Sequence, residues 1–271
     1  MARERPALLL VGCGKMGGAM LAGWLDRKVT DQVVAVEPAD GGGLEFKGRP
    51  GVTIVNDLLG IGTFKPDVIV FATKPQVMDA AVPAYRRLAS EGTLFVSIAA
   101  GKTIGFFEKH LGPVAVIRAM PNTPAQVGRG ISVACANGKV EADQRALAER
   151  LLSSVGEVGW VDDEALIDAV TAVSGSGPAY VFLLAECLAA AGEAVGLPKD
   201  LAMQLARATV SGAGELLHQS KESAAKLRQN VTSPGGTTLA ALNVLMADDG
   251  LRPLMIKAVE AAARRSRELA G

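Results

Sequence analysis

The chain of 271 residues is long enough for one large or two medium domains, and its 28 basic and 28 acidic residues give a formal net charge of zero. This balance excludes a global electrostatic attraction to nucleic acid or to an anionic membrane, and an aromatic content of 4% leaves few rings on which bases could stack. Three widely separated cysteines, with no CxxC pair and no histidine cluster nearby, argue against a zinc site, so we expect neither a bound metal nor a nucleic-acid partner.

In the first part of the chain, short runs rich in Val, Ile and Leu alternate with helical patterns, which is typical of a parallel sheet covered on both faces. The predicted strands are residues 7–11, 33–37, 52–55, 68–72, 94–98, 114–118, 131–135 and 158–161. The predicted helices are residues 18–27, 76–88, 104–111 and 142–152, and the glycine-rich segment 40–51 is expected to be a surface loop. We therefore expect an α/β Rossmann-type domain, with a mostly parallel, doubly wound sheet, over residues 1–162.

From Ala165 to the end of the chain the strand signal disappears, and the sequence becomes helical and rich in Ala and Leu. This change predicts an all-α second domain over residues 163–271. Residues 178–195 are apolar nearly all round, and a helix without a polar face must be buried on all sides. Because the second domain is too small to surround such a helix, we expect another subunit to cover it; a central helix in a monomeric bundle is the alternative.

No segment of the sequence has the pattern of a targeting or membrane-spanning element. The basic start is followed by an apolar run, residues 7–11, which is too short for a signal-peptide core. No apolar stretch is expected to reach the length of a membrane span. We therefore expect a cytoplasmic protein with reduced thiols and no membrane partner.

A glycine-rich turn follows the first predicted strand and precedes the first predicted helix, which is the context that the G-x-G-x-x-G pattern requires. Gly12 permits the tight turn, Gly14 lets the backbone approach a pyrophosphate, and Gly17 brings helix and strand close together. The N–H groups at the helix start would face the phosphates. The residues expected to contact a dinucleotide here are Gly12, Cys13, Gly14, Lys15, Met16 and Gly17.

An acidic residue, Glu37, ends the second predicted strand, twenty residues after Gly17. A carboxylate at this position typically accepts hydrogen bonds from the adenosine ribose, and it would repel a 2′-phosphate. The pattern therefore favours NADH over NADPH, with a solvated loop carboxylate as the alternative.

Three further strand ends would line the dinucleotide site, because ligands of open parallel sheets lie outside the carboxyl ends of the strands. The candidate contacts there are Ala72, Thr73, Lys74, Pro75, Ile98, Ala99, Ala100 and Asn122. Lys74 would approach a phosphate or an acidic substrate, with a solvated surface lysine as an equal alternative. Asn122 lies in a proline-flanked loop that cannot be helical, which suggests a place near the nicotinamide or a purely structural turn.

Residues 231–238 are the most unusual segment of the helical half. A Gly-Gly pair followed by two threonines at a predicted helix start gathers several backbone N–H groups and hydroxyls in one place. Such a group of donors is a good receptor for a small carboxylate, and an ordinary capped turn is the alternative. The candidate substrate contacts are Ser233, Gly235, Gly236, Thr237 and Thr238.

Together these segments closely resemble the pyrroline-5-carboxylate reductase family, nearly from end to end of the chain. The matching motifs are residues 12–17, 73–76, 99–101, 118–124, 174–180 and 231–238. The resemblance implies reduction of L-1-pyrroline-5-carboxylate to L-proline by hydride transfer from NADPH or NADH. It also implies a homodimer, often assembled further into a decamer, with the substrate pocket between the nicotinamide and residues 233–238.

The resemblance adds one contact and shows one departure from the family. By match to the family's motif, Asn56 would contact the adenosine ribose. Where the family often has Ser or Asn with a nearby Arg, this chain has Glu37-Pro38. This departure favours NADH over the family's usual NADPH.

The substrate that the resemblance implies is a cyclic imine with a carboxylate, and its reduction requires a proton on the imine nitrogen. No His, Cys or carboxylate side chain stands in the substrate-like motifs, so we expect catalysis by positioning and polarisation rather than by a strong general acid. Backbone donors around Ser233, Gly236 and Thr237 would hold the carboxylate. The expected catalytic residue is Thr238, whose hydroxyl would form a hydrogen bond with the imine nitrogen.

Two other functions remain open. A β-hydroxyacid-type dehydrogenase also joins a Rossmann domain to a helical one, but it places a catalytic lysine one turn into the interdomain helix, where residues 179–186 contain none. A non-catalytic dinucleotide-sensing module is the second alternative. Such a module would have no use for the donor-rich loop at residues 233–238.

Overall fold

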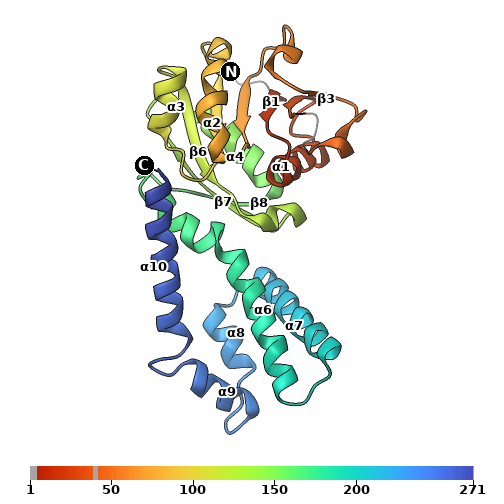
Figure 1. Ribbon diagram of the computed structural model, residues 1–271, viewed down its shortest axis with the longest axis vertical. Helices are drawn as coiled ribbons and strands as arrows, with labels where there is room; N and C mark the ends of the chain where they lie inside the picture. The colour runs from red at the N-terminus through yellow and green to blue at the C-terminus, as the bar shows by residue number, and fades with distance from the viewer. Residues whose placement is uncertain (1–4, 39–41, 271) are drawn as a thin grey trace. The chain divides into compact units, whose positions relative to one another are not determined.

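The computed structural model describes residues 5–38 and 42–270, and the chain divides into two compact units, many of whose elements are labelled in Figure 1. The first unit comprises Met1–Gly175 together with Ala263–Gly271. The second comprises Ser176–Ala262. The chain thus leaves the first unit once and returns to it at its end.

The division between the units lies further along the chain than the expected boundary between residues 162 and 163. Helix α5 (Leu166–Val170) stays with the sheet, because the side chain of Ile167 is fully buried in the sheet's core. The end of the last helix, α10 (Leu251–Ala270), also belongs to this unit. There the Ser266 hydroxyl donates a hydrogen bond to Asp168 Oδ1 at 2.6 Å.

One eight-stranded sheet forms the first unit, in the order β3-β2-β1-β4-β5-β6-β7-β8. All neighbouring strands are parallel except β6 and β7. The strands are β1 (Ala7–Val11), β2 (Gln32–Val36), β3 (Val52–Val55), β4 (Val68–Phe71), β5 (Leu94–Ser97), β6 (Ala115–Met120), β7 (Gly130–Ala136) and β8 (Gly156–Trp160). The predicted mostly parallel α/β sheet is confirmed, with each strand's bounds within two residues of the expected ones.

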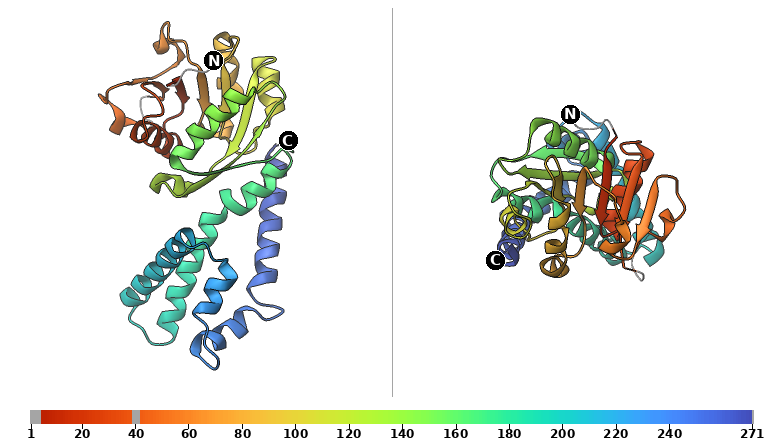
Figure 2. Two further views of the ribbon diagram at one scale, coloured as in Figure 1. Left: turned by 180° about the vertical axis from the view of Figure 1, so that it is seen from behind. Right: turned by 90° about the horizontal axis from the view of Figure 1, so that it is seen from above.

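Helices cover both faces of this sheet (Figure 2), and two separate clusters of buried side chains fill the two interfaces. In β1, Leu8 and Leu10 belong to one cluster, whereas Leu9 and Val11 belong to the other. The helices on the first cluster are α1 (Lys15–Asp26) and α4 (Ala142–Leu152), and those on the second are α2 (Pro75–Ala81), α3 (Ile104–Leu111) and α5. Because both faces are buried, the strands have continuous apolar runs rather than alternating patterns.

Two local predictions for this unit were wrong. The helix expected over residues 76–88 is divided into α2 and a 3-10 segment, Val82–Leu88, because Pro83 has no N–H to continue the helical hydrogen bonding. The segment 40–51, of which residues 40 and 41 lie outside the described residues, is not only a surface loop. It contains a short 3-10 helix, Leu44–Phe46, which buries Phe46 in the first cluster.

The described residues of the second unit form helices joined by short turns, without a strand, which confirms the expected all-α domain. Its helices are α6 (Gly177–Ala194), α7 (Lys199–Gln219), α8 (Ala224–Asn230), α9 (Thr237–Leu245) and the first part of α10. Helices α6 and α7 pack closely where Gly192 faces Ala202, since a Cβ on this glycine would lie 3.2 Å from the alanine Cβ.

Helix α6 carries apolar side chains that the single chain leaves open. Phe182, Leu183 and Leu184 are 63%, 56% and 52% exposed. A π-helical turn joins α5 to α6, so that residues 166–194 form one helical run. This run has the length and composition of a membrane span, and only 11% of its most apolar stretch is buried within the chain. The expectation that no stretch reaches this length was therefore wrong, because the π-helical turn makes one long run out of two helices.

Candidate functional site

The predicted cofactor residues all lie at one edge of the sheet. Strands β1 to β6 are parallel, so their carboxyl ends share this edge. The predicted contacts are residues 12–17 after β1, Glu37 after β2, Asn56 after β3, residues 72–75 after β4, residues 98–100 after β5 and Asn122 after β6. This is the edge at which open α/β sheets bind their ligands.

The glycine turn has the geometry that a dinucleotide requires. Gly12 has φ +95°, and a Cβ there would lie 2.9 Å from the Ala72 carbonyl oxygen; a Cβ on Gly17 would lie 2.2 Å from the Gly12 carbonyl oxygen. By contrast, among the described residues no atom outside its chain neighbours lies within 4 Å of a Cβ on Gly14, which directly precedes helix α1. Close packing therefore requires two of the glycines, whereas the third leaves open space where a pyrophosphate would meet the helix start. The residues fit a dinucleotide.

Glu37 is turned toward this glycine turn and accepts a hydrogen bond from the backbone N–H of Cys13. Burial, followed by the negative charges of Glu37 and Glu45, raises the pKa of the Cys13 thiol to about 12. The thiol is therefore protonated at neutral pH and is a poor nucleophile. The acidic surroundings also disfavour a further negative charge beside the turn.

Thr73 carries a buried hydroxyl that has no hydrogen-bond partner among the described residues. Its methyl group lies against the glycine turn, 2.8 Å from the position of a Cβ on Gly12. Because buried hydroxyls are normally bonded, a ligand at this edge would supply the missing partner. The next residue, Lys74, is exposed at the N-cap of α2, which is compatible with either a phosphate contact or a solvated lysine.

The two predicted asparagines differ in their surroundings. Asn122 Oδ1 accepts a hydrogen bond at 2.9 Å from the backbone N–H of Ile131, so this side chain holds the loop between β6 and β7 in place. Asn56 is exposed directly after β3. A structural turn at Asn122 is thus visible in the structure, while the ligand contacts of both residues stay predictions.

The predicted substrate residues lie together between α8 and α9 in the helical unit. Gly235 has φ +69°, and Gly236 is the N-cap of α9. The Gly236 N–H donates to the Ser233 carbonyl at 3.0 Å, which closes the turn. Helix α9 begins at Thr237, so the first N–H groups of the helix have no intrahelical acceptors. The sequence Ser-Pro-Gly-Gly-Thr-Thr therefore forms a helix start with free donors, which can bind a carboxylate.

One polar cluster beside the cofactor edge was not predicted. Glu164 Oε1 accepts a hydrogen bond from Arg118 Nη1 at 2.9 Å and another from the backbone N–H of Ile104 at 2.8 Å. Burial, followed by the nearby negative charge of Glu164, raises the pKa of the Cys135 thiol. An arginine inside an otherwise apolar strand was the available signal, because a buried guanidinium requires an anionic partner.

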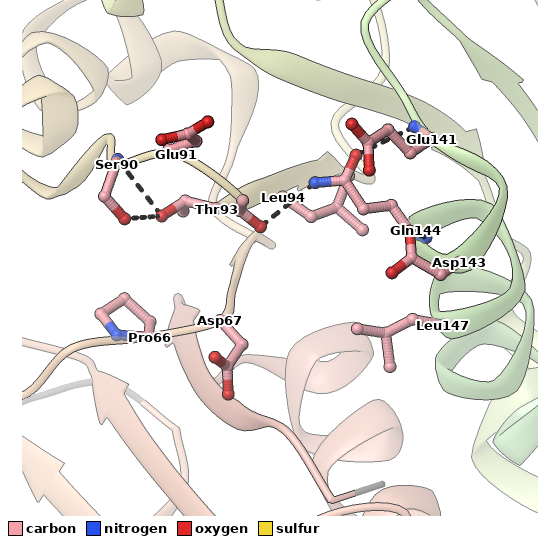
Figure 3. Close-up of a pocket in the computed structure, with 11 residues that line it drawn as sticks. Pro66, Asp67, Ser90, Glu91, Thr93, Leu94, Glu141, Asp143, Gln144 and Leu147 are labelled. Carbon is pink, nitrogen blue, oxygen red and sulfur yellow. Dashed lines mark hydrogen bonds between the residues drawn. The ribbon is translucent and has the colours of Figure 1, made fainter. Parts of the chain in front are cut away.

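A polar cleft of about 360 Å³ lies at the opposite edge of the sheet (Figure 3). Its acidic and polar groups bond within the protein: Gln144 Nε2 donates to the Gly92 carbonyl at 3.1 Å, and the hydroxyls of Ser90 and Thr93 lie 2.7 Å apart. In the described part of the chain, no three His, Cys, Asp or Glu side chains are placed to hold a metal ion. The Gln144 hydrogen bond in this cleft ties the start of α4 to the segment before β5, and the cleft lies apart from the cofactor edge.

Two family models match the chain, one for each half. A model described as pyrroline-5-carboxylate reductase dimerisation matches residues 164–269. A model described as NADP oxidoreductase, coenzyme F420-dependent, matches residues 7–101. The strands from β1 to β5 lie in the second match, and helices α5 to α9 lie in the first.

Known relatives match nearly the whole chain. The pyrroline-5-carboxylate reductase of Pseudomonas aeruginosa is 40% identical over 267 residues, which cover 98% of this chain and 97% of that protein. The structure of a pyrroline-5-carboxylate reductase from Coxiella burnetii has a TM-score of 0.88 at 37% identity and covers 98% of this chain and 99% of that one. A Plasmodium falciparum pyrroline carboxylate reductase with NADP bound has a TM-score of 0.82 at 28% identity and covers 100% of both chains.

Proposed function

The chain belongs to the pyrroline-5-carboxylate reductase family, and from this premise we propose how its own residues carry out the reaction. It reduces L-1-pyrroline-5-carboxylate to L-proline with NADPH or NADH, a step of proline biosynthesis. The observation that carries this conclusion is 40% identity over 98% of the chain to a reductase of that name. The glycine turn at the carboxyl edge of the sheet agrees with it.

The direct test is coenzyme oxidation by the purified protein, followed as the loss of nicotinamide absorbance when pyrroline-5-carboxylate is added. Turnover that depends on the imine is the expected result. Coenzyme binding without turnover would instead support a dinucleotide-sensing module, and turnover of β-hydroxyacids would support that class of dehydrogenase.

In the coenzyme site, the start of α1 at Gly14 would hold the pyrophosphate, and the segments after β4 and β5 would line the nicotinamide side. Two features of the described residues support this arrangement: the open space at Gly14 and the Thr73 hydroxyl, which has no partner among them. Asn56 would contact the adenosine ribose, and Asn122 would lie near the nicotinamide. When bound, the nicotinamide supplies the hydride that adds to the imine carbon.

In the substrate site, the residues at the start of α9 hold the imine by its two polar ends. The backbone donors around Ser233, Gly236 and Thr237 bind the carboxylate, with favourable alignment of the helix dipole. The Thr238 hydroxyl forms a hydrogen bond with the imine nitrogen, which carries the proton as the C=N double bond becomes single. The residues orient and polarise the substrate, and none of them acts as a strong acid.

The position of Glu37 supports a preference for NADH. Its carboxylate lies against the glycine turn, and it would repel the 2′-phosphate of NADPH. We expect wild-type kcat/KM to be higher with NADH, and we expect Glu37→Ser to lower the NADH-to-NADPH ratio by about ten- to a hundredfold, since one charge repulsion is removed. Steady-state kinetics with both coenzymes measure this ratio.

A matched acidic residue serves as the control for this variant. Glu91 is exposed in the cleft at the opposite edge of the sheet, so Glu91→Ser should leave the coenzyme ratio unchanged. A wild-type protein that strongly prefers NADPH, or a Glu37→Ser protein with an unaltered ratio, would contradict the assignment.

The open apolar face of α6 supports a homodimer in which the partner subunit covers it. Several large apolar side chains exposed side by side on one helix normally mark an interface. We expect a dimer or a larger assembly, up to a decamer, by size-exclusion chromatography with light scattering. Introduction of a charge by Phe182→Glu should shift the protein toward smaller species, and a monomeric wild type would refute the interface.

A cytoplasmic location without a membrane anchor follows from the same proposal. The helical run over residues 166–194 is then apolar because it faces a partner subunit rather than lipid. Cell fractionation tests the point, with the protein expected in the soluble fraction.

A further inference from the structure

The turn between β5 and α3, residues 98–103, leads directly from the cofactor edge into a helix whose first N–H is held by a side chain from far along the chain. Glu164 Oε1 accepts that hydrogen bond, from the backbone N–H of Ile104, at 2.8 Å. The side chain of the N-cap residue, Thr103, accepts its hydrogen bond from Phe106 N, not from Ile104 N. Glu164 therefore completes the start of this helix, which its own N-cap leaves partly unsatisfied.

The same oxygen of Glu164 is fixed by a buried charge. Arg118, whose side chain is 4% exposed, donates from Nη1 to Glu164 Oε1 at 2.9 Å. A guanidinium this deeply buried on β6 needs an anion nearby, so the position of the carboxylate is set by the sheet itself. The chain of contacts runs from β6 through one carboxylate to the end of the turn that leaves β5.

Other residues of the turn have contacts of different kinds. At its start, Ile98 N–H donates to the Phe71 carbonyl at 3.0 Å, as a continuation of the sheet. Lys102 pairs with Asp79 at 2.5 Å, but the aspartate is 65% exposed, and exposed pairs contribute little to stability. Gly101 lies beside the last helix, since a Cβ there would be 3.0 Å from the carbonyl oxygen of Leu269. At the end of the turn the support is Glu164, a partly exposed carboxylate anchored by the buried charge of Arg118.

We propose that Glu164 is a positioning residue for the coenzyme: it holds the turn at residues 98–103 in the conformation that lines the nicotinamide side of the site. This inference rests on the proposed coenzyme site, because it is that site which the turn would line. Glu164 acts through the backbone N–H of Ile104, without touching the coenzyme itself. Coenzyme affinity should therefore depend on the hydrogen-bond acceptor at this position rather than on its charge.

Variants at Glu164 separate the two properties. Glu164→Ala removes the acceptor and should raise the Kd for the coenzyme about tenfold, as for the loss of one aligned hydrogen bond. Glu164→Gln keeps an amide oxygen for Ile104 N–H but leaves Arg118 without its anion. Its Kd should therefore stay within about twofold of the wild type while its unfolding temperature falls.

A third variant, Glu164→Asp, decides the question even if the Glu164→Ala protein folds poorly. Glu164→Asp keeps the negative charge near Arg118 but draws the acceptor back by one methylene from Ile104 N–H. It should be more stable than Glu164→Gln and yet bind coenzyme less tightly. Isothermal titration calorimetry gives the Kd, and thermal unfolding gives the stability.

Glu141 provides a matched control, because it also places a carboxylate at a helix start, in the capping box of α4. It lies in the cleft at the opposite edge of the sheet, so Glu141→Ala should lower the unfolding temperature without changing the Kd. Affinities that follow stability across all these variants, or that do not change at all, would overturn the inference.

The calorimetry measures coenzyme binding without the imine substrate. The positioning role of Glu164 can therefore be tested independently of the proposed reaction. If the wild type binds coenzyme but fails to reduce pyrroline-5-carboxylate, the proposed reaction is wrong, and the affinities of the Glu164 variants still decide the positioning role. If the wild type catalyses the reaction and the variant affinities match their stabilities, the positioning role alone is wrong.

Discussion

Gly17→Ala is expected to weaken coenzyme binding by about a hundredfold or more. The added Cβ would lie 2.2 Å from the carbonyl oxygen of Gly12. Because the obstacle is backbone, helix α1 must move away from the end of β1, and the N–H groups at its start leave the position that receives the pyrophosphate. Titration calorimetry with NADH measures the loss, and overpacking of this kind also costs about 1–3 kcal/mol of stability.

Gly14→Ala is the matched comparison within the same turn. No atom of the described protein lies within 4 Å of a Cβ at Gly14, so this variant should unfold close to the wild-type temperature. It should nevertheless bind coenzyme poorly, because the methyl group occupies the approach of the pyrophosphate. Normal coenzyme binding by either variant would contradict the assigned role of the turn.

Thr238→Ala is expected to lower kcat/KM for pyrroline-5-carboxylate by about ten- to a thousandfold, the range for losing one or more aligned polar contacts. The hydroxyl lies at the start of α9, beside the donors proposed to bind the carboxylate. Its removal leaves the imine nitrogen without its hydrogen bond, while the coenzyme site on the other unit is untouched. Steady-state kinetics should therefore change at constant Kd for the coenzyme.

Two variants sharpen this expectation. Thr238→Ser retains a hydroxyl and should recover most of the activity. Thr232→Ala makes the same substitution in the same loop, but the Thr232 hydroxyl already donates to the Arg228 carbonyl at 2.7 Å and is committed to the end of α8. It should affect stability more than turnover, and a Thr238→Ala protein with wild-type kinetics would remove Thr238 from the mechanism.

The elements that the sequence predicted best are those whose signal is local. Residues 7–11 and 52–55 are strands with the expected bounds, as residues 104–111 and 142–152 are helices, because apolar runs and helical periodicity depend on neighbouring residues. The 3-10 turn beginning at Val82 was missed although its cause, Pro83, is also local. The periodicity simply continued across the proline.

The candidate site also consists of parts with a local signal in the sequence and parts without one. The sequence predicts those parts of the candidate site whose signal lies within a few neighbouring residues. They are the turn at residues 12–17, the acid Glu37 at a strand end and the donor-rich loop at residues 233–238. The parallel order of β1 to β6 then places the cofactor segments at one edge, as the alternation of strands and helices had indicated.

Which distant residues support these segments is visible in the folded chain alone. Glu164 reaches Arg118 across 46 residues and Ile104 across 60, and Phe46 leaves its glycine-rich segment for the core. The same is true of the unit boundary, which the burial of Ile167 moves beyond residue 162. The chemistry of each segment follows from its own residues, because turns, caps and glycine positions are local. The pairing of a buried charge depends on the register of the sheet, and no local pattern encodes it.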